Sequence, residues 1–227
     1  MKRLLTIFLF LLILPVQADS EAPNRNEVLA AKATPARRIL LPNGMVVLLK
    51  EAPGHDLVAL EMLCQVGLAN EETPTAGLIA LWSEILNERL EEATEEHYRI
   101  VDRSVSIEPD FLRFSIQGPA DEADTMLEAL AGLVENDTYS EKLVNKKRKE
   151  LVEDIKAGRA GSQNQLYTIF RLLFYRLHPY RRQHTSGEMA VERIDAELIA
   201  QFHKQYLVPD RLVLAACGRI SRTGFED

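Results

Sequence analysis

The side chains of this sequence best suited to chemistry are its five histidines, because imidazole is a common metal ligand and general base in proteins. A helical zinc site carries two histidines at i and i+4 on one face of the helix. No two histidines of this sequence have that spacing; they stand isolated at His55, His97, His178, His184 and His203. The histidine pattern alone therefore predicts no metal site, and we interpret these residues as structural or exposed.

The two cysteines, Cys64 and Cys217, are the other candidates for covalent chemistry. Both stand in strand-like segments, the sequence contains no C-x-x-C, and neither is predicted to act as a nucleophile. Two interpretations stay open. The cysteines pair if the chain reaches an oxidising compartment and their Cα atoms come within about 7 Å, or they remain buried thiols that pack as small hydrophobic residues.

Composition and motifs exclude several other classes of function. The sequence holds no G-x-S-x-G nucleophile motif, no phosphate-binding loop and no Rossmann glycine pattern. Its formal net charge of −7 argues against nucleic acid, which attracts clustered Lys and Arg. The basic run from Lys142 to Lys149 is interpreted as a solvated helix face. We therefore expect no nucleic-acid partner.

The N-terminus has the pattern of a secretory signal peptide. Lys2 and Arg3 precede an apolar run from Leu4 to Leu14, and Val16-Gln17-Ala18 has the small residues of a cleavage site. Removal of residues 1–18 leaves 209 of the 227 residues and takes the formal charge from −7 to −9. We expect a periplasmic or secreted protein with no stable membrane span after cleavage near Ala18. The alternative is an uncleaved membrane anchor.

Hydrophobic periodicity predicts the elements that would position any site. Residues 19–36 are polar and small, and we expect them to form a flexible lead-in. Asn43-Gly44 between two apolar runs predicts a β-hairpin. Apolar residues at helical spacing from Leu78 to Ile85 predict a helix whose apolar face, Trp82 included, packs in the core.

The other predicted strands and helices come in groups without strict alternation. The strands cover residues 57–66, 105–108, 111–116 and 211–216. The helices, the first of them a helix or a helix and loop, cover residues 91–101, 121–134, 140–156, 162–177 and 195–206. This grouping favours an α+β fold with helices packed on one face of a largely antiparallel sheet. We treat residues 37–227 as a single domain.

Four blocks of the sequence, in this order, are similar to one peptidase family. They are the hairpin L-L-P-N-G-M-V-V-L-L-K-E, the segment Gly67-Leu68-Ala69-Asn70-Glu71 with Gly77-Leu78, the tripeptide His178-Pro179-Tyr180, and the run from Phe202 through the strand that ends at Gly218. Together they resemble the insulinase-like M16 peptidases, inverted zinc metallopeptidases that include the mitochondrial processing peptidase. The resemblance implies a LuxS/MPP-like domain fold and the N-terminal position in an M16 protein.

The resemblance also implies where zinc chemistry would lie. In the family, H-x-x-E-H supplies two zinc ligands and, between them, the glutamate that activates water. Alignment of Gly77-Leu78 with the family's G-L-A-H places these roles on Ala80, Ser83 and Glu84. Imidazole is absent from all three positions, and so is the general base. We therefore expect no catalytic residue here.

The family's third zinc ligand is a glutamate on a later helix. The matching position in this sequence is Asp154, and Lys147 stands where an acidic residue precedes the ligand in the family. Two carboxylates without nitrogen or sulfur do not form the usual ligand set of catalytic zinc. We expect no bound metal and no other cofactor.

The function implied by the resemblance is that of an inactive M16-like pseudopeptidase. Such a chain assists a zinc-bearing M16 partner subunit or second M16 domain, or holds an extended peptide at a sheet edge without cutting it. Two alternatives remain. The chain is an active zinc endopeptidase whose site is completed by His97 or by a partner's residues, or it is a truncated, non-functional fragment of a two-domain M16 protein. The truncated-fragment alternative arises because residues 220–227 resemble the start of a further helix.

Overall fold

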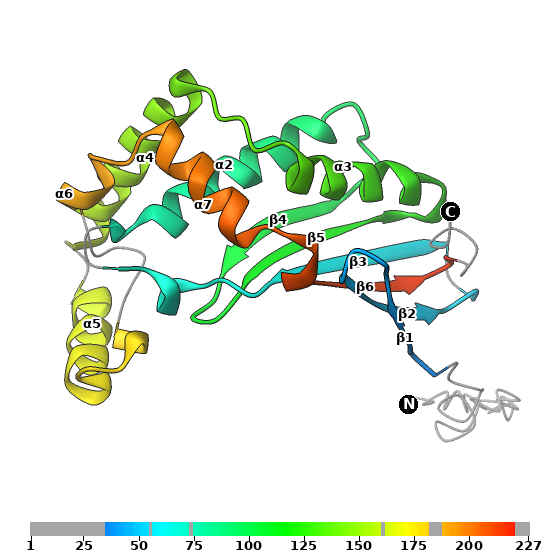
Figure 1. Cartoon of the computed structure of the whole chain (residues 1–227), viewed down its shortest axis with the longest axis horizontal. Coiled ribbons are helices and arrows are strands. Elements are labelled where there is room, and N and C mark those ends of the chain that lie inside the picture. The colour runs from blue at the N-terminus through cyan, green and yellow to red at the C-terminus, as the bar shows by residue number, and fades with distance from the viewer. Residues whose placement is uncertain (1–34, 55, 73–74, 160–161, 182–187, 221–227) are drawn as a thin grey trace, which may run out of the picture. The chain divides into compact units, whose positions relative to one another are not determined.

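Six β-strands form one mixed sheet in the order β1-β2-β6-β3-β5-β4 (Figure 1). The structure is a computed structural model and describes residues 35–54, 56–72, 75–159, 162–181 and 188–220. The predicted signal peptide, almost all of the lead-in, His55, His184 and residues 221–227 lie outside the described residues. The strands are β1 (Arg37–Leu40), β2 (Val46–Glu51), β3 (Leu57–Cys64), β4 (Asp102–Ile107), β5 (Leu112–Pro119) and β6 (Leu212–Gly218).

Four of the helices follow predicted segments closely, and short 3-10 turns lie between several of the elements. The helices are α2 (Leu78–Ala93), α3 (Ala123–Glu135), α4 (Glu141–Arg159), α5 (Ser162–Tyr175), α6 (Glu188–Val191) and α7 (Ala196–Tyr206). The 3-10 turns are η1 (Leu68–Asn70), η3 (Ala120–Glu122), η4 (Pro179–Arg181) and η5 (Pro209–Arg211). Within the described ranges, no helix has the length and apolar character needed to cross a bilayer.

Strand pairing confirms the largely antiparallel sheet. Among the strands of the described residues, only β2 and β6 run parallel, and the other four pairings are antiparallel. The predicted hairpin is formed by β1 and β2, and its turn is closed by a 3.1 Å hydrogen bond from the Met45 amide to Asn43 Oδ1. The predicted central strand is β3, which lies between β6 and β5.

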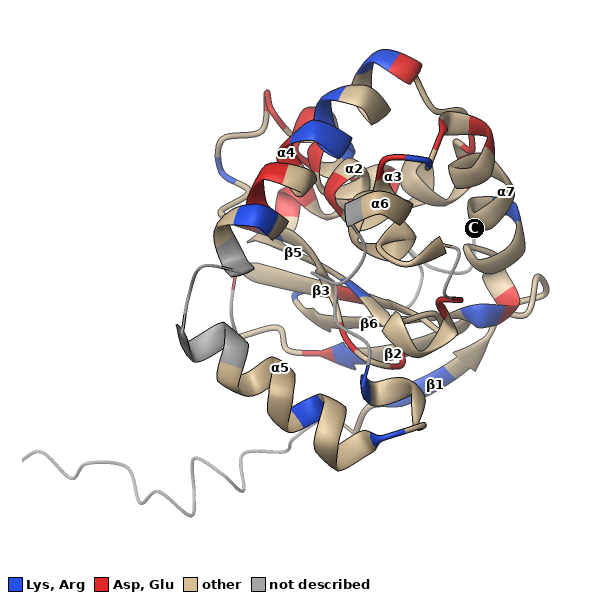
Figure 2. Ribbon diagram, turned by 90° about the vertical axis from the view of Figure 1, so that its left-hand side faces the viewer, with Lys and Arg blue, Asp and Glu red and all other residues tan. Residues whose placement is uncertain are grey.

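One face of the sheet carries the helical layer. In Figure 1, α2, α3 and α7 lie over this face, and α4 packs beside α2. Leu78, Leu81, Trp82 and Ile85 are fully buried in the core between α2 and the sheet, as the helical spacing predicts. Helix α5 lies away from the helical layer: Figure 1 shows it below and beyond one end of the sheet, and Figure 2 shows it below the sheet.

One predicted element is wrong. Residues 91–101 do not form a second helix or helix-loop of their own, because α2 continues without a break to Ala93. The helix ends where the Thr94 hydroxyl donates a 2.8 Å hydrogen bond to the Leu90 carbonyl, and the chain then turns toward β4. A threonine hydroxyl that bonds backbone carbonyls competes with helical hydrogen bonding. The short helix α6 was not predicted.

A buried chain of hydrogen bonds links three helices beneath the surface of the helical layer. Trp82 of α2 donates from Nε1 to the Tyr139 hydroxyl at 2.7 Å, and Tyr139 lies 2.6 Å from Nδ1 of His203 in α7. His203 Nε2 lies 2.9 Å from the carbonyl oxygen of Val134, at the end of α3. Because Tyr139 accepts from Trp82, its own proton points to Nδ1, and His203 donates from Nε2 as a neutral imidazole.

Burial makes the stability of this hydrogen-bonded chain depend on pH. It raises the pKa of Tyr139 to about 12 and lowers the pKa of His203 below its ordinary value of 6.5. A proton added at His203 Nδ1 would face the Tyr139 hydroxyl, which already donates to that atom and accepts from Trp82. The folded chain therefore resists protonation at His203, whereas the unfolded chain takes up the proton at the ordinary pKa.

We predict that the free energy of unfolding falls as pH is lowered through 6.5, in a way that depends on His203. Below that pH the unfolded chain binds a proton that the folded chain excludes, until the folded pKa is reached. His203→Gln is expected to lose about 1–3 kcal/mol at pH 7.5, because buried partners lose their hydrogen bonds. Urea denaturation of both proteins from pH 7.5 to 5.0 measures the effect. The difference between them should shrink as pH falls; a constant difference contradicts the prediction.

Candidate functional site

The candidate site is the first half of α2, and its position depends on a buried carboxylate that precedes the helix. Glu71 is 3% exposed. Its two oxygens accept the Gly77 amide at 3.1 Å each, and Oε1 also accepts the Ile79 amide at 2.9 Å. These amides belong to the N-terminus of α2, where unpaired N–H groups and the helix dipole attract negative charge. The carboxylate therefore fixes where α2 begins.

Two glycines of the same sequence block are required by geometry. Gly77 has φ of +91°, and a Cβ atom added to it would lie 2.3 Å from Cγ2 of Val191 in α6. A Cβ atom on Gly67 would lie 2.5 Å from the carbonyl oxygens of Glu108 and Pro109 in the β4–β5 turn. Any larger residue at either position would displace the backbone leading into α2. The second block that resembles the family is therefore a scaffold for this helix.

The three positions aligned with H-x-x-E-H lie in α2 and hold no metal-binding nitrogen. Ala80 and Ser83 are buried, and the Ser83 hydroxyl donates a 2.8 Å hydrogen bond to the Ala80 carbonyl. Glu84 is exposed, as expected for a solvated residue at this point of the helix. A neutral hydroxyl already bonded to backbone cannot take a proton from water as a glutamate does. This part of α2 serves as a core helix.

The α4 side of the candidate site is dominated by ion pairs. Asp154, the position aligned with the third ligand, is exposed. Lys147 reaches across to α2 and lies 2.7 Å from Glu88, and Lys146 lies 2.9 Å from the same carboxylate. The hydrogen bond from Lys147 holds the pKa of Glu88 below its ordinary value. Ion pairs between these two lysines and Glu88 thus connect α2 and α4.

The described histidines, His97, His178 and His203, have hydrogen-bond partners other than the aligned zinc-site positions. His97, the residue proposed to complete an alternative zinc site, lies beyond the C-terminal end of α2, and its Nδ1 is 2.7 Å from Glu122 Oε2. His178 accepts the Tyr180 amide at Nδ1, at 3.2 Å, which fits the structural role expected for it. Over the described parts of the chain, no group of three or more His, Cys, Asp or Glu residues is placed to hold a metal ion.

Strand register decides the open question about the cysteines. Cys64 of β3 pairs with Leu212 of β6, whereas Cys217 pairs with Ala59, five residues away along the strands. That offset separates the cysteines by about 16 Å along the strand direction, beyond disulfide reach, and both are free. Cys64 is buried, and burial raises the pKa of its thiol to about 12. Cys217 is exposed, so the buried-thiol interpretation holds for Cys64 alone.

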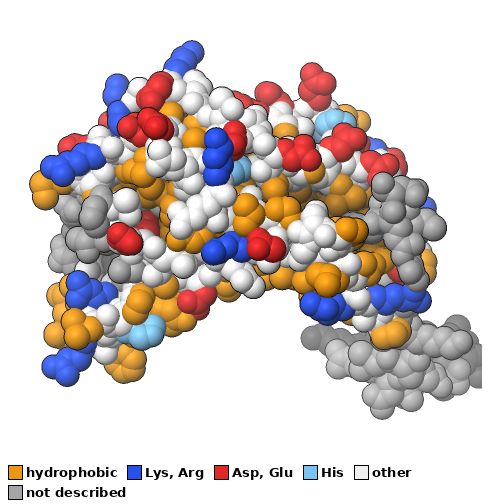
Figure 3. Space-filling view, viewed as in Figure 1, with side chains coloured by type: hydrophobic (Ala, Val, Ile, Leu, Met, Phe, Trp, Pro, Cys, Tyr) orange, Lys and Arg blue, Asp and Glu red, His pale blue; other side chains and the backbone are white. Residues whose placement is uncertain are grey.

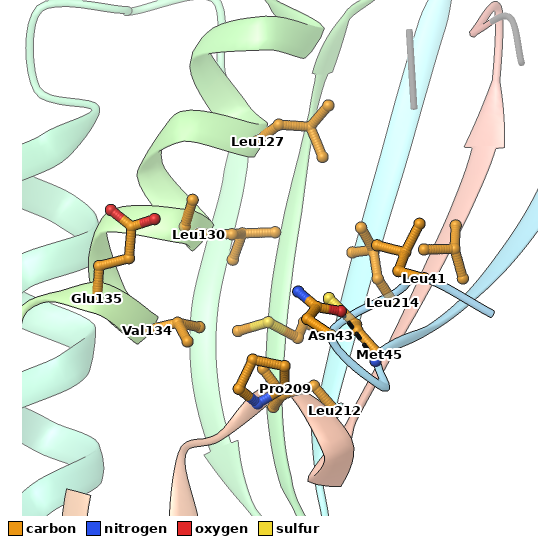
Figure 4. A pocket seen from close by; sticks show the side chains of 13 residues that line it. Leu41, Asn43, Met45, Leu127, Leu130, Val134, Glu135, Pro209, Leu212 and Leu214 are labelled. Atoms are coloured by element: carbon orange, nitrogen blue, oxygen red, sulfur yellow. Dashed lines mark hydrogen bonds between the residues drawn. The ribbon is translucent and has the colours of Figure 1, made fainter. Parts of the chain in front are cut away.

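A second candidate site is an apolar pocket of about 290 Å³ between α3 and the β1–β2 turn (Figure 4). Its walls include Leu127, Leu130 and Leu214, and its polar lining side chains are Asn43 and Glu135. Asn43 Oδ1 is bonded to the Met45 amide, and Glu135 is exposed. The lining therefore lacks the convergent polar groups of a catalytic site. The pocket also contains none of the residues aligned with the zinc site.

The mixed sheet and its helical layer form an α+β domain, and this domain has the fold of M16 peptidase domains. It is similar to a peptidase M16 inactive domain from Pseudomonas fluorescens, with a TM-score of 0.76 and 16% identity over 85% of this chain and 48% of that chain. A protease from Helicobacter pylori gives a TM-score of 0.75 and 17% identity, over 84% of this chain and 48% of that chain.

The periplasmic protease PqqL from Escherichia coli is a further similar structure, with a TM-score of 0.74 and 14% identity over 86% of this chain and 23% of that chain. This chain thus spans half or less of the length of the proteins it resembles. No protein-family model matches the sequence, and a search of curated proteins by sequence found no match. The likeness to the solved structures concerns the fold.

The sequence locates the candidate helix but gives no role to the residues that position it. Glu71 stands in a block that resembles the family, yet its spacing from Gly77 does not match a short-range helix cap, in which the capping side chain is adjacent to the first turn. The Tyr139–His203 contact joins residues 64 positions apart, and no periodicity predicts it. Both interactions depend on the tertiary fold.

We predict that Glu71→Gln destabilises the protein by about 2 kcal/mol, because a neutral amide presents one acceptor where a carboxylate presents two and loses the attraction of the helix dipole. Chemical denaturation measures the change. Glu72→Gln is the matched control, since Glu72 is exposed and its substitution should stay within about 0.5 kcal/mol of wild type. Equal effects of the two substitutions would contradict a capping role for Glu71.

Proposed function

We propose that this chain is an inactive M16-like pseudopeptidase that assists a zinc-bearing partner of the same fold. The observation that carries the proposal is the chemistry of α2 at the three aligned positions. Ala80 and Ser83 are buried in the helix layer and Glu84 is exposed, so this face offers neither imidazole nor general base. Hydrolysis by a zinc peptidase needs a metal-bound water and a base that deprotonates it.

The α2–α4 contact supports the same proposal. Lys147 of α4 places an ammonium group against Glu88, one helical turn beyond Glu84 in α2. A cation held there by an ion pair opposes the approach of a second cation. The exposed carboxylates Glu84 and Asp154 remain as two hard oxygen ligands, short of the three protein ligands usual for catalytic zinc.

A partner role is also supported by the comparisons. One similar structure is described as an inactive M16 domain. A domain with this fold can therefore lack peptidase activity, and this supports the same assignment for the present chain. The similar Pseudomonas and Helicobacter chains are about twice as long as the part matched by this chain. We propose that the missing half of the assembly is a zinc-bearing M16 partner subunit or second M16 domain.

Peptide holding at a sheet edge is the weaker form of the proposal. The edge strand β4 lies beside α2, and the Val105 amide at this edge already donates a 2.9 Å hydrogen bond to Asn87 Oδ1. An added peptide strand would have to displace that bond to use the amide. At the opposite edge, β1 has only four residues. These contacts favour assistance to a partner over capture of an extended peptide.

We also propose that the chain is exported, on the basis of the charged, apolar and small-residue segments at its N-terminus. Cell fractionation followed by N-terminal sequencing of the native protein tests this proposal. The mature protein is expected outside the cytoplasm with Asp19 as its first residue. Recovery with Met1 or Lys2 intact would support the uncleaved anchor instead.

We predict that the purified chain binds less than about 0.1 zinc per molecule and does not cleave unfolded peptides, because its site lacks nitrogen ligands. Metal analysis and a peptide-cleavage assay with and without a chelator measure both quantities. Glu84→Gln and Asp154→Asn are the matched variants, and neither should change zinc content. One zinc per chain with chelator-sensitive cleavage would establish the active-peptidase alternative.

The assisting role has its own experiment. Pull-down from the native compartment is expected to recover a protein with an intact H-x-x-E-H motif, and addition of this chain is expected to raise the kcat/KM of that protein at least tenfold. If no such protein binds and the chain is insoluble by itself, the truncated-fragment alternative is favoured. Binding without any change in kcat/KM would reduce the role to a structural one.

A further inference from the structure

The apolar pocket between α3 and the β1–β2 turn, called here the α3 pocket, is larger than the voids of a well-packed core. Its volume is about 290 Å³, whereas packed interiors leave few spaces larger than a water molecule. Sites for small molecules are concave and mostly apolar, with a few polar groups that select the ligand. The interior and the rim of the α3 pocket therefore indicate which kind of molecule it binds.

Three neighbouring strands form the floor of the α3 pocket. The strand register places Leu214 of β6 between Val47 of β2 and Met62 of β3. These three side chains are 6%, 0% and 1% exposed, respectively. Figure 4 shows α3 on one side of this floor and the β1–β2 turn on the other. The floor therefore presents only aliphatic and thioether groups, and it belongs to the core of the domain.

The walls of the α3 pocket are also apolar. Leu127, Leu130 and Val134 come from one face of α3, at spacings i, i+3 and i+7, and Met45 of the β1–β2 turn stands across from them (Figure 4). An amide or a charged group carried into this interior would lose its hydrogen bonds to water. At about 30 Å³ for each water-sized group, the volume holds roughly eight to ten carbon atoms. The interior therefore favours an aliphatic chain of that length.

The rim of the α3 pocket carries its two polar side chains, Asn43 and Glu135. Asn43 Oδ1 accepts the Met45 amide at 3.1 Å, which leaves the Nδ2 group as a donor, and Figure 4 shows this nitrogen turned toward α3. Glu135 is exposed, and among the described residues its carboxylate has no hydrogen-bond or ion-pair partner. The rim thus offers one neutral donor and one full negative charge, and the charge dominates the choice of head group.

The position of Glu135 strengthens its attraction for a cation. It is the last residue of α3, where the helix dipole is negative, and the last turn contains no basic residue. Two nearby cations are engaged with other groups: Arg89 donates to the Asn136 carbonyl at 2.8 Å, and Lys204 lies 3.2 Å from Asp137. Figure 3 shows acidic side chains over α3, above apolar side chains between this helix and the sheet. The rim therefore favours a positively charged head group.

We propose that the α3 pocket binds a primary alkylamine of about eight to ten carbons. Its chain lies on the floor formed by β2, β6 and β3, and its ammonium group pairs with Glu135 at the C-terminal end of α3. A carboxylate or phosphate head group would be repelled by Glu135 and by the same helix end. A peptide amino end carries the same ammonium group, but its amides would enter an interior without hydrogen-bond partners. The binding of an alkylamine is independent of the proposed function as a peptidase partner.

Calorimetric titration of the purified chain with octylamine and with octanoate at pH 7.5 tests the head group. One octylamine per chain is expected, and octanoate should bind at least fivefold more weakly, because Glu135 and the helix end attract one and repel the other. Glu135→Gln should bring the two affinities within about twofold of each other. Glu128→Gln, at an exposed residue of α3 outside the pocket, should preserve the preference. A preference unchanged by Glu135→Gln, or no saturable binding of octylamine, overturns the proposal.

A pair of phenylalanine substitutions locates the bound chain, because exposed apolar side chains of α5, such as Phe174, can also take up amphiphiles. Ala131 lines the rim and is exposed, so Ala131→Phe is expected to fill the entrance and weaken octylamine binding at least tenfold. Gly132→Phe is the matched control, since a Cβ atom added to Gly132 meets nothing within 4 Å. Its affinity should stay within about twofold of wild type.

Both phenylalanine variants change exposed positions of α3, so their far-UV circular dichroism should match that of wild type. Equal octylamine affinities in the two variants would place the ligand outside the α3 pocket and overturn the proposal. Leucyl-leucinamide is the peptide probe, and it should bind more weakly than octylamine because its amides lose hydrogen bonds in the pocket. Tighter binding of this dipeptide would assign the pocket to peptide amino ends and also overturn the proposal.

Discussion

The buried carboxylate of Glu71 is the interaction on which the rest of the helical layer depends. It fixes the first turn of α2 through three hydrogen bonds to backbone amides, and α2 carries Trp82 into the core. From Trp82 the hydrogen-bonded chain passes through Tyr139 and His203 to the end of α3. A displaced α2 would therefore break the contacts that hold α3 and α7 over the sheet.

This dependence explains why the sequence can resemble a peptidase family without having the H-x-x-E-H residues in α2. The parts that resemble the family, Gly67 through Glu71 and Gly77, position α2 by close packing and capping. The aligned catalytic positions do not position α2. Ala80 packs in the core as a small side chain, and the Ser83 hydroxyl donates its hydrogen bond to the Ala80 carbonyl in the same helix. A helix with Ala80 and Glu84 at the aligned histidine positions therefore still meets the folding requirements of α2.

Much of the fold could be predicted from local patterns, and the site in part. Asn43-Gly44 predicts the hairpin because its turn chemistry is local, and the Leu78–Ile85 spacing predicts the buried face of α2. The helix predicted from Leu78 to Ile85 is longer in the structure, where α2 continues to Ala93 and ends at the hydrogen bond between the Thr94 hydroxyl and the Leu90 carbonyl. Register could not be read from the sequence, so the separation of Cys64 from Cys217 required the structure. The exposure of the apolar side chains of α5 could not be predicted either, since an apolar stripe is typical of a buried helix.

The place of β6 in the sheet has a consequence for the order of folding. The last described strand of the chain lies between β2 and β3, so the hairpin of residues 37–51 has no direct strand contact with β3. Until residues 212–218 have been synthesised, the two parts of the sheet cannot join and the core beneath α2 stays incomplete. Long-range pairings of this kind slow folding, because a long loop must close first. Whatever local structure forms earlier, the sheet of this chain can therefore be completed only when its last described strand is available.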